Sequence, residues 1–171
     1  MAIPAIPTGA FDLKGIAGKL LNSIDRTDSS SWGRMSSENP SSGGYTNGRA
    51  IARACAIVAN GGEFNGVRIL SPETIALAGA EHAYGPCLYL GPLRLGLGFG
   101  LDSKEFPAPS PTSMHWGGFG GSWGLMDPKA GLSFSYTPNN WVVPEVSSGQ
   151  FAIERRLARF MDALTKLLPT L

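Results

Sequence analysis

Two stretches of the chain place apolar residues at the three- and four-residue spacing of an amphipathic helix. Between Asn47 and Asn60 the apolar positions are Ile51, Ala54, Cys55 and Val58. This spacing predicts a helix, which Asn60-Gly61-Gly62 ends because glycine readily adopts the left-handed conformation of a helix C-terminus. A second stripe predicts a helix that ends at Pro169 and needs a sheet or another helix to cover it. Its members are Ile153, Leu157, Phe160, Met161, Leu164 and Leu168.

Other stretches have the short apolar runs and turn residues that are typical of strands. Residues 122–126 and 132–137 predict an antiparallel hairpin around the turn Asp127-Pro128-Lys129-Ala130-Gly131. We also expect strands at 67–70 and 93–101, and short helices at 10–24 and from Ser71-Pro72-Glu73 onward. Helices followed by glycine-rich strands and a closing helix indicate a mixed α/β fold of the α+β type, with an antiparallel sheet.

The composition narrows the class of protein. Glycine and proline supply 23 and 13 of the 171 residues, which argues against a helical bundle. Lysine and arginine number 14 and aspartate and glutamate 13, so a net charge of +1 predicts no nucleic-acid partner and no membrane partner. No apolar run approaches the roughly 18 residues of a membrane helix. The length suits one domain with a core of its own.

The remaining bulk features exclude further classes of site. No secretory signal is visible at the N-terminus, so the localisation is unknown, with the cytoplasm as the default expectation. Cys55 and Cys87 are too few for a disulfide framework and fit no zinc pattern, and Cys55 is expected as a buried thiol. His82 has no partner pattern and is expected at the surface. The sequence therefore predicts no metal and no cofactor.

Candidate functional residues are most concentrated in the segment His115-Trp116-Gly117-Gly118-Phe119-Gly120-Gly121-Ser122. Glycine at this density allows a backbone to approach a ligand closely. One interpretation is purely structural, a glycine-rich edge strand with a solvent-facing histidine. A nucleophile elbow at Ser122 would need a helix after the serine and a histidine downstream, but both histidines precede Ser122. A phosphate-binding loop would need a Walker or G-x-G-x-x-G sequence and a helix after the glycines.

Several segments in order resemble the beta-lactamase-related serine hydrolases, which include class C beta-lactamases, esterases, D-alanyl-D-alanine carboxypeptidases and LACTB-type proteins. The resemblance covers roughly residues 38 to 142. Its segments are Gly48-Arg49-Ala50-Ile51-Ala52-Arg53, Ala59-Asn60-Gly61-Gly62-Glu63, Leu70-Ser71-Pro72-Glu73-Thr74, Gly96-Leu97-Gly98-Phe99-Gly100-Leu101, His115 to Ser122, and Asp127-Pro128-Lys129-Ala130-Gly131-Leu132.

The resemblance implies an acyl-transfer mechanism and a role for each residue of one motif. In that family a serine in S-x-x-K attacks a carbonyl to form an acyl-enzyme, a tyrosine in Y-x-N helps to move the proton, and a K-T-G or H-x-G triad lines the opposite wall. His115-Trp116-Gly117 matches the triad. His115 would be a catalytic hydrogen-bonding group that can carry positive charge, and the Gly118 N–H an oxyanion donor worth roughly 3–4 kcal/mol. Trp116 and Gly117 would contact substrate, with Gly117 keeping the strand clear.

Two of the family's three motifs are missing from this sequence. No serine has a lysine three residues later. Tyr45-Thr46-Asn47 spells Y-x-N but stands much closer to the triad than in the family, so we interpret Tyr45 as coincidental. We therefore expect residues 1–37 to be a linker and short helix. We expect residues 38–171 to be the C-terminal part of an incomplete beta-lactamase/transpeptidase-like fold, an antiparallel sheet covered by the C-terminal helix.

Two hypotheses about function follow, and they leave open whether this chain is an enzyme by itself. The first is the C-terminal half of a serine hydrolase of an ester, amide or beta-lactam, inactive alone. Its partners would be a small-molecule acyl substrate in the full-length protein and the missing N-terminal half. Such a half would expose a sheet edge and face, and we expect it to be poorly soluble or to associate. The second is a non-catalytic, degenerate module of the same fold that serves binding or assembly.

Overall fold

A computed structural model describes residues 36, 40, 43–87, 91–118, 120–140, 146–147, 150–151 and 155–170. Contacts divide the chain into two compact units, Met1–Asn47 and Gly48–Leu171. Nearly all described residues belong to the second unit. The predicted linker and short helix of residues 1–37 lie outside the described residues, apart from Ser36, and stay a prediction.

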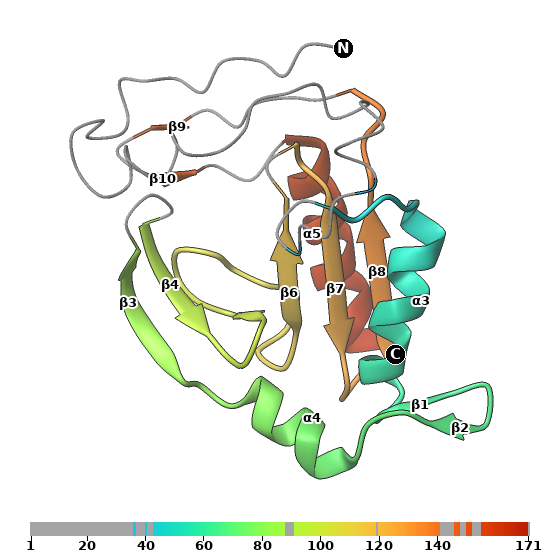
Figure 1. Ribbon diagram of the computed structural model, residues 1–171. Coiled ribbons are helices and arrows are strands. Elements are labelled where there is room, and N and C mark those ends of the chain that lie inside the picture. The colour runs from blue at the N-terminus through green and yellow to red at the C-terminus, as the bar shows by residue number, and fades with distance from the viewer. Residues whose placement is uncertain are drawn as a thin grey trace. The chain divides into compact units, whose positions relative to one another are not determined.

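The second unit is built on a six-stranded antiparallel sheet with the strand order β3-β4-β5-β6-β7-β8 (Figure 1). These strands are β3 (Ala83–Cys87), β4 (Gly91–Leu95), β5 (Gly100–Leu101), β6 (Met114–Gly117), β7 (Trp123–Asp127) and β8 (Leu132–Tyr136). Each strand pairs with its neighbour in sequence. The β7–β8 hairpin confirms the predicted one. Two small hairpins accompany the sheet, β1 (Glu63–Phe64) with β2 (Val67–Arg68) and β9 (Val146–Ser147) with β10 (Gln150–Phe151).

Three helices form where the apolar spacing and the end signals predicted them. They are α3 (Gly48–Ala59), α4 (Pro72–Gly79) and α5 (Arg155–Leu167), the last followed by the 3-10 turn η2 (Leu168–Thr170). The hydroxyl of Ser71 caps α4 by accepting a hydrogen bond from the Thr74 N–H at 3.2 Å. No described helix has the length and apolar character that crossing a bilayer requires.

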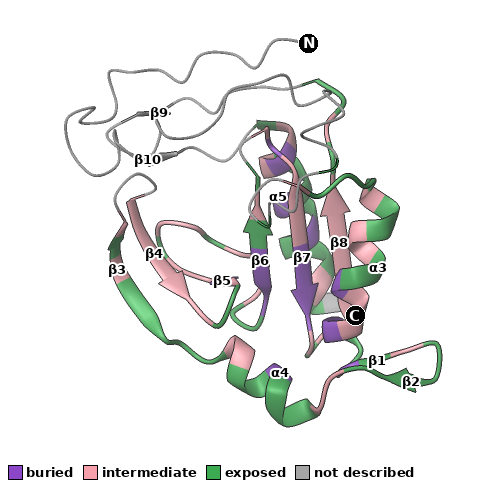
Figure 2. Ribbon diagram, viewed as in Figure 1, coloured by how far each residue is buried: buried purple, intermediate pink, exposed green. Residues whose placement is uncertain are grey.

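Alternate side chains of β7 enter two separate layers of core, one on each face of the sheet. Met126 belongs to the layer toward α3 and α4, and Leu125 packs with Leu157 and Met161 of α5. The first layer also contains Cys55, Val58, Ala59, Ile75, Leu101 and Met114. Figure 2 shows buried residues on β7, on the lower part of β6 and along α5. The prediction of an antiparallel sheet covered by the C-terminal helix is therefore confirmed.

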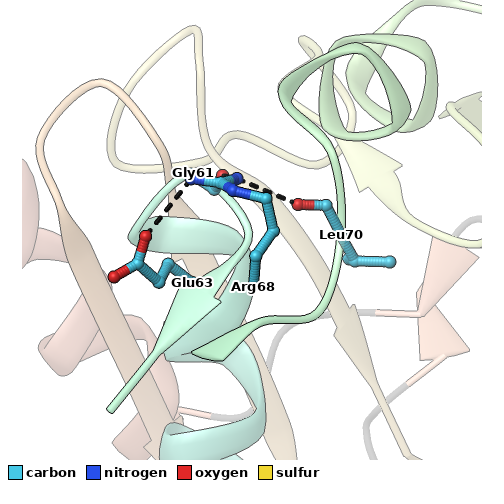
Figure 3. A network of polar contacts seen from close by, with 4 residues as sticks. All are labelled: Gly61, Glu63, Arg68 and Leu70. Atoms are coloured by element: carbon cyan, nitrogen blue, oxygen red, sulfur yellow. Dashed lines mark hydrogen bonds and ion pairs between the residues drawn. The ribbon is translucent and has the colours of Figure 1, made fainter. Parts of the chain in front are cut away.

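Arg68 fixes the β1–β2 hairpin to the segment that leads into α4 (Figure 3). Its guanidinium donates to the carbonyl oxygens of Gly61 at 3.0 Å and Leu70 at 3.1 Å, and pairs with Glu63 at 3.3 Å. Both charged side chains are about half exposed, so the two carbonyl contacts hold the geometry more than the ion pair does.

The predicted strand at 93–101 was wrong, because the structure divides it into β4 and β5 with a turn between them. Gly98 has a φ of +82°, which continues a turn rather than a strand. A Cβ on Gly96 would lie 2.1 Å from the Ala78 carbonyl oxygen, so the chain passes very close to the end of α4 here. The glycines at 96 and 98 therefore serve a turn and a close approach. The strand expected at 67–70 is also shorter, since only Val67 and Arg68 pair.

Candidate functional site

A buried carboxylate, Asp127, holds the segment that leads into β6. It lies at the end of β7 and is fully buried. Backbone N–H groups of Lys129 and Ala130 each donate to it at 3.0 Å, which closes the β7–β8 turn. Hydroxyl groups of the loop before β6 donate to the same carboxylate, from Ser110, from Thr112 at 3.0 Å and from Ser113 at 2.9 Å. One side chain thus joins the turn to the loop and fixes where β6 begins.

The charge of Asp127 is stabilised by these donors. Burial by itself raises the pKa of this carboxyl, but the hydrogen bonds from Ser110, Ala130, Ser113 and Thr112 outweigh it and lower the pKa below its ordinary value. The group is therefore an ionised structural anchor at neutral pH. It is not poised for proton transfer.

His115 follows on β6 with its side chain inside the protein. It is 4% exposed, and its ring stacks on the indole of Trp123 with the ring centroids 4.9 Å apart and the planes 19° apart. Neither ring nitrogen has a partner with ordinary hydrogen-bond geometry among the described residues, although the Leu101 backbone is near enough to influence the imidazole. The Trp123 indole N–H also lacks a partner there. Groups of this kind are rarely left unpaired in a core, so these are the polar atoms of the segment that call for an explanation.

Burial is the main influence on the protonation of His115. It lowers the pKa of the imidazole to about 4, while Asp102 and the Leu101 carbonyl act in the opposite direction without compensating. In this structure the ring is therefore neutral at pH 7, with one N–H donor and one acceptor nitrogen. The positively charged form that the resemblance allowed for His115 is not the stable one here.

The same indole explains why position 117 is glycine. A Cβ on Gly117 would lie 2.3 Å from Cε3 of Trp123, so the ring occupies the space a side chain would need. Gly117 pairs directly with Trp123 across the strands. The resemblance implied that Gly117 keeps the strand clear for substrate; in the structure it makes room for Trp123.

The Gly118 N–H, expected as an oxyanion donor, is already hydrogen bonded. It donates to the Ser122 carbonyl at 2.8 Å, and the Gly121 N–H donates to the Gly118 carbonyl at 3.0 Å. The two bonds close the turn between β6 and β7. Hydrogen-bonded and unbonded pairs alternate along an antiparallel ladder, so the Gly117 N–H points away from β7.

No described strand pairs with the edge of β6 beside Gly117. Pairing with β5 covers only Met114 and His115, so no described strand lies beside Trp116 and Gly117 on that side. Met114 and His115 are buried and Trp116 is exposed, and Figure 2 shows β6 changing from buried to exposed along its length. Trp116 itself is 46% exposed. The structure therefore brings a backbone donor and an exposed aromatic together at one sheet edge.

The structure also bears on the alternative interpretations of residues 115–122. β6 lies between β5 and β7 and His115 is buried, so the edge strand with a solvent-facing histidine is wrong. Ser122 is followed by β7 and not by a helix. The nucleophile elbow and the phosphate-binding loop both need a helix at this point, so the structure supports neither interpretation. His82 is exposed and Cys55 is buried, as predicted.

Two further candidates stay outside the site. Tyr45 belongs to the first contact unit, so its prediction as a coincidental Y-x-N is neither supported nor contradicted. Within the described ranges, no group of three or more histidine, cysteine, aspartate or glutamate side chains is placed to hold a metal ion.

Sequence reasoning missed Asp127 and Trp123 as organisers of this site. Asp127 was assigned only to a turn, although an aspartate that opens a hairpin turn commonly accepts from the backbone two residues on. The three hydroxyls of Ser110, Thr112 and Ser113 lie far enough away in sequence to give no signal. Trp123 pairs with Gly117 in the β6–β7 register, and only that register shows that its ring covers the glycine.

Comparisons with known proteins agree on one group of hydrolases. The chain is 33% identical over 114 residues to the esterase/beta-lactamase LipL of Mycobacterium tuberculosis, a match that covers 66% of this chain and 26% of LipL. A family VIII carboxylesterase of known structure is 32% identical, with a TM-score of 0.60 over 70% of this chain and 31% of the other. No protein-family model matches the chain.

Two further solved structures share the fold. A penicillin-binding protein homologue from Caulobacter crescentus is 29% identical, with a TM-score of 0.52 over 56% of this chain and 26% of that one. EstA from Arthrobacter nitroguajacolicus Rue61a has a TM-score of 0.59 over 73% and 32%, and its 21% identity shows the fold alone. The chain thus spans about a quarter to a third of the length of these proteins.

The arrangement of antiparallel sheet and helices matches beta-lactamase/transpeptidase-like folds, as predicted. The names of the similar proteins include the terms esterase, beta-lactamase and penicillin-binding protein. Over the part that these comparisons cover, the chain is similar to beta-lactamase-related serine hydrolases.

Proposed function

We propose that this chain forms one wall of an acyl-transfer site for an ester, amide or beta-lactam, and that the attacking serine belongs to a segment outside this sequence. The observation that carries the proposal is the edge of β6 beyond His115, where no described strand pairs, the Gly117 N–H is directed outward and Trp116 is exposed. An acyl carbonyl laid along this edge would meet a backbone donor before it met any side chain.

The chemistry of such a wall is electrostatic. When a serine oxygen attacks the carbonyl carbon, the C=O π bond breaks and negative charge collects on the carbonyl oxygen. A fixed N–H donor at that oxygen stabilises the transition state by roughly 3–4 kcal/mol. The Gly117 N–H points to the open side in this structure, and the Gly118 N–H becomes a donor if its bond to the Ser122 carbonyl opens.

His115 supports this role as a neutral group. Each unpartnered ring nitrogen can take one hydrogen bond, one as donor and one as acceptor. A residue from the missing segment, such as a catalytic tyrosine, is the kind of partner that would satisfy it. His115 alone does not replace the missing nucleophile, because no serine in the sequence has a lysine three residues later.

A chimera tests the proposal. The matched region of this chain replaces the corresponding region of the family VIII carboxylesterase, and hydrolysis of a p-nitrophenyl ester is measured against the parent enzyme. We expect a folded chimera with measurable turnover, since the wall is supplied by this chain and the nucleophile by the host. A chimera that melts cooperatively but hydrolyses no ester would contradict the proposal.

A second candidate is the non-catalytic module, a relative kept for binding or assembly. The closed state of the site favours it, because the Gly118 N–H is engaged and the His115 ring is enclosed. The same chimera separates the two functions. A folded, inactive chimera that still binds a non-hydrolysable acyl analogue would support the module.

A further inference from the structure

The tip of the β1–β2 hairpin is the exposed dipeptide Asn65-Gly66. Phe64 of β1 pairs directly with Val67 of β2, so these two residues form the whole connection between the strands. Asn65 has a φ of +51° and Gly66 a φ of +75°, and two positive values in a two-residue connection define a type I′ turn. Within the described part of the chain, Asn65 is the only residue other than glycine with a positive φ.

No described group restrains this dipeptide. Neither the Asn65 side-chain amide nor the Gly66 N–H has a hydrogen bond to a described residue. A Cβ on Gly66 would meet no atom within 4 Å. The dipeptide belongs to neither core layer, and the hairpin projects away from the six-stranded sheet in Figure 1. The backbone at the tip can therefore rotate without disturbing the core.

An asparagine followed by glycine can react with its own backbone. The Gly66 nitrogen attacks Cγ of Asn65, a new C–N bond closes a five-membered succinimide ring, and the side-chain nitrogen leaves as ammonia with the proton that the Gly66 N–H gives up. Water then opens the ring and returns a proton to that nitrogen. Hydrolysis at Cγ gives aspartate, and hydrolysis at the backbone carbonyl gives isoaspartate, in which the chain runs through the Cβ.

The hairpin needs only one local rotation to reach the reactive geometry. The ring closes when the Gly66 nitrogen lies beside Cβ of Asn65, at a ψ of about −120°, the value of the first central residue in a type II′ turn. A type II′ turn keeps the positive φ of Asn65, and glycine at position 66 accepts a φ of either sign. Rotation of the peptide group between them is therefore sufficient, and the flanking strand pair can stay in place.

The same dipeptide occurs at Asn60-Gly61, where the structure restrains it. Asn60 is also exposed, so exposure does not distinguish the two asparagines. However, the Gly61 N–H donates to the Val58 carbonyl at 3.1 Å, and the Gly61 carbonyl accepts from Arg68 at 3.0 Å. Rotation of the peptide group between Asn60 and Gly61 would break the bond to Val58. The fold thus favours the reaction at one asparagine over the other.

We propose that Asn65 is a site of spontaneous deamidation in the folded chain, through a succinimide, to aspartyl and isoaspartyl products. The aspartyl product keeps the hairpin, because Asp-Gly is also a favoured type I′ dipeptide. The isoaspartyl product adds a methylene to the backbone and disrupts the pairing across the tip. The base of the hairpin holds in both, since the N–H groups of Ile69 and Leu70 donate to the Gly62 carbonyl at 2.8 and 3.1 Å. The site does not depend on the proposed acyl-transfer function.

Peptide mapping of the full chain, incubated in mildly alkaline buffer, tests the proposal. Cleavage with trypsin and Glu-C places Asn65 in the peptide 64–68 and Asn60 in the peptide 54–63. A third pair, Asn47-Gly48, falls in the separate peptide 39–49 and does not disturb the comparison. We expect the mass gain of an amide-to-acid change to appear in 64–68 at least about fivefold faster than in 54–63, the factor that corresponds to opening one backbone hydrogen bond.

Two controls separate the fold from the dipeptide itself. In concentrated urea the two rates should become similar, because the restraint on Asn60 is lost. Asn65→Asp supplies the aspartyl form of 64–68 as a chromatographic standard, so a second new peptide of the same mass is the isoaspartyl form. Equal rates at the two asparagines in the folded chain, or no mass gain in 64–68, overturns the proposal. So does a single product that coelutes with the aspartyl standard, because direct hydrolysis of the amide would then replace the succinimide.

Discussion

His115 carries an imidazole whose two nitrogens have no partner among the described residues, although the ring is almost completely buried. A core histidine kept for packing alone is expensive, because an unpaired buried polar group costs about 1–3 kcal/mol. Stacking on Trp123 recovers part of that cost at most. Under the proposed function, a residue of the segment that carries the serine would supply the missing partner.

The pKa of His115 gives a direct prediction about stability. Its folded pKa of about 4 is below the unfolded value of about 6.5. The unfolded chain therefore binds the extra proton first, and stability is fully present above pH 6.5 and falls as the pH drops from 6.5 toward 4. NMR titration of the His82→Gln variant, which leaves one histidine, should show no protonation above pH 5. A midpoint near 6.5 would contradict the buried, unpartnered position.

The Asp127 carboxylate makes a second contribution to stability that is lost in acid, because protonation removes its charge. Its folded pKa is lowered, so its stabilisation is complete above the unfolded value of about 3.9 and disappears as the pH falls through the folded pKa. As the pH falls, stability should thus be lost in two steps, first the contribution of His115 and then, at lower pH, that of Asp127. Denaturant unfolding measured from pH 7 to pH 3 reports both.

Replacement of Asp127 tests the same anchor at neutral pH. Asp127→Asn puts an amide NH₂ where hydroxyl and N–H groups donate, and should lower the free energy of unfolding by about 2–3 kcal/mol. Asp162→Asn, an exposed change on α5, is the control and should have no measurable effect. Equal stability of the two variants in urea would show that the carboxylate does not hold the loop before β6.

Among the elements, the β6–β7 pair depends on a glycine facing a tryptophan. Gly117→Ala would force the Trp123 ring to move and break its stack on His115, at a cost of about 1–3 kcal/mol. The near-UV circular dichroism of the tryptophan should change with it. Gly85→Ala in β3 is the control, because a Cβ there meets nothing within 4 Å. A Gly117→Ala protein with wild-type spectrum and stability would contradict the contact.

The sequence predicted the elements whose periodicity is strong and failed where glycine has several uses. α3, α5 and the β7–β8 hairpin follow from apolar spacing and turn residues, and the structure has them within a few residues. The glycines at 96, 98 and 100 read as one strand because alternation alone does not distinguish a turn from a close approach. The carbonyl of Ala78 and the positive φ of Gly98 make the distinction, and both depend on tertiary context.

The resemblance indicated which segment holds the candidate site, but the arrangement of its side chains could be predicted only in part. The resemblance assigned the site to residues 115–118, of which residues 115–117 belong to β6 in the structure. The burial of His115, the indole over Gly117 and the bond from Gly118 to Ser122 all depend on strand register. Register is set by pairing across the sheet, so a single sequence without its partner strands does not reveal it. The catalytic and substrate roles of His115, Trp116, Gly117 and Gly118 stay predictions.

At the scale of the whole molecule, exposed apolar side chains among the described residues favour association of the isolated chain. Tyr84, Leu97 and Trp116 are about half exposed, and no described strand pairs with the outer edge of β3 or with β6 beside Trp116 and Gly117. We expect the isolated chain to associate at micromolar concentration. Light scattering after size exclusion measures this. A sharp monomeric species with a cooperative melt would contradict an incomplete fold.

The proposed function requires that this chain supply a wall of an acyl-transfer site and no nucleophile. Reaction with a fluorophosphonate probe, followed by intact-mass measurement and peptide mapping, distinguishes such a chain from an independent enzyme. It is applied to the chain alone and to the chimera with the carboxylesterase. We predict no adduct on the isolated chain, and one adduct on the chimera at a serine of the host segment. A stoichiometric adduct on the isolated chain, at Ser122 or any other serine, would show that the chain carries a nucleophile of its own and overturn the proposed function.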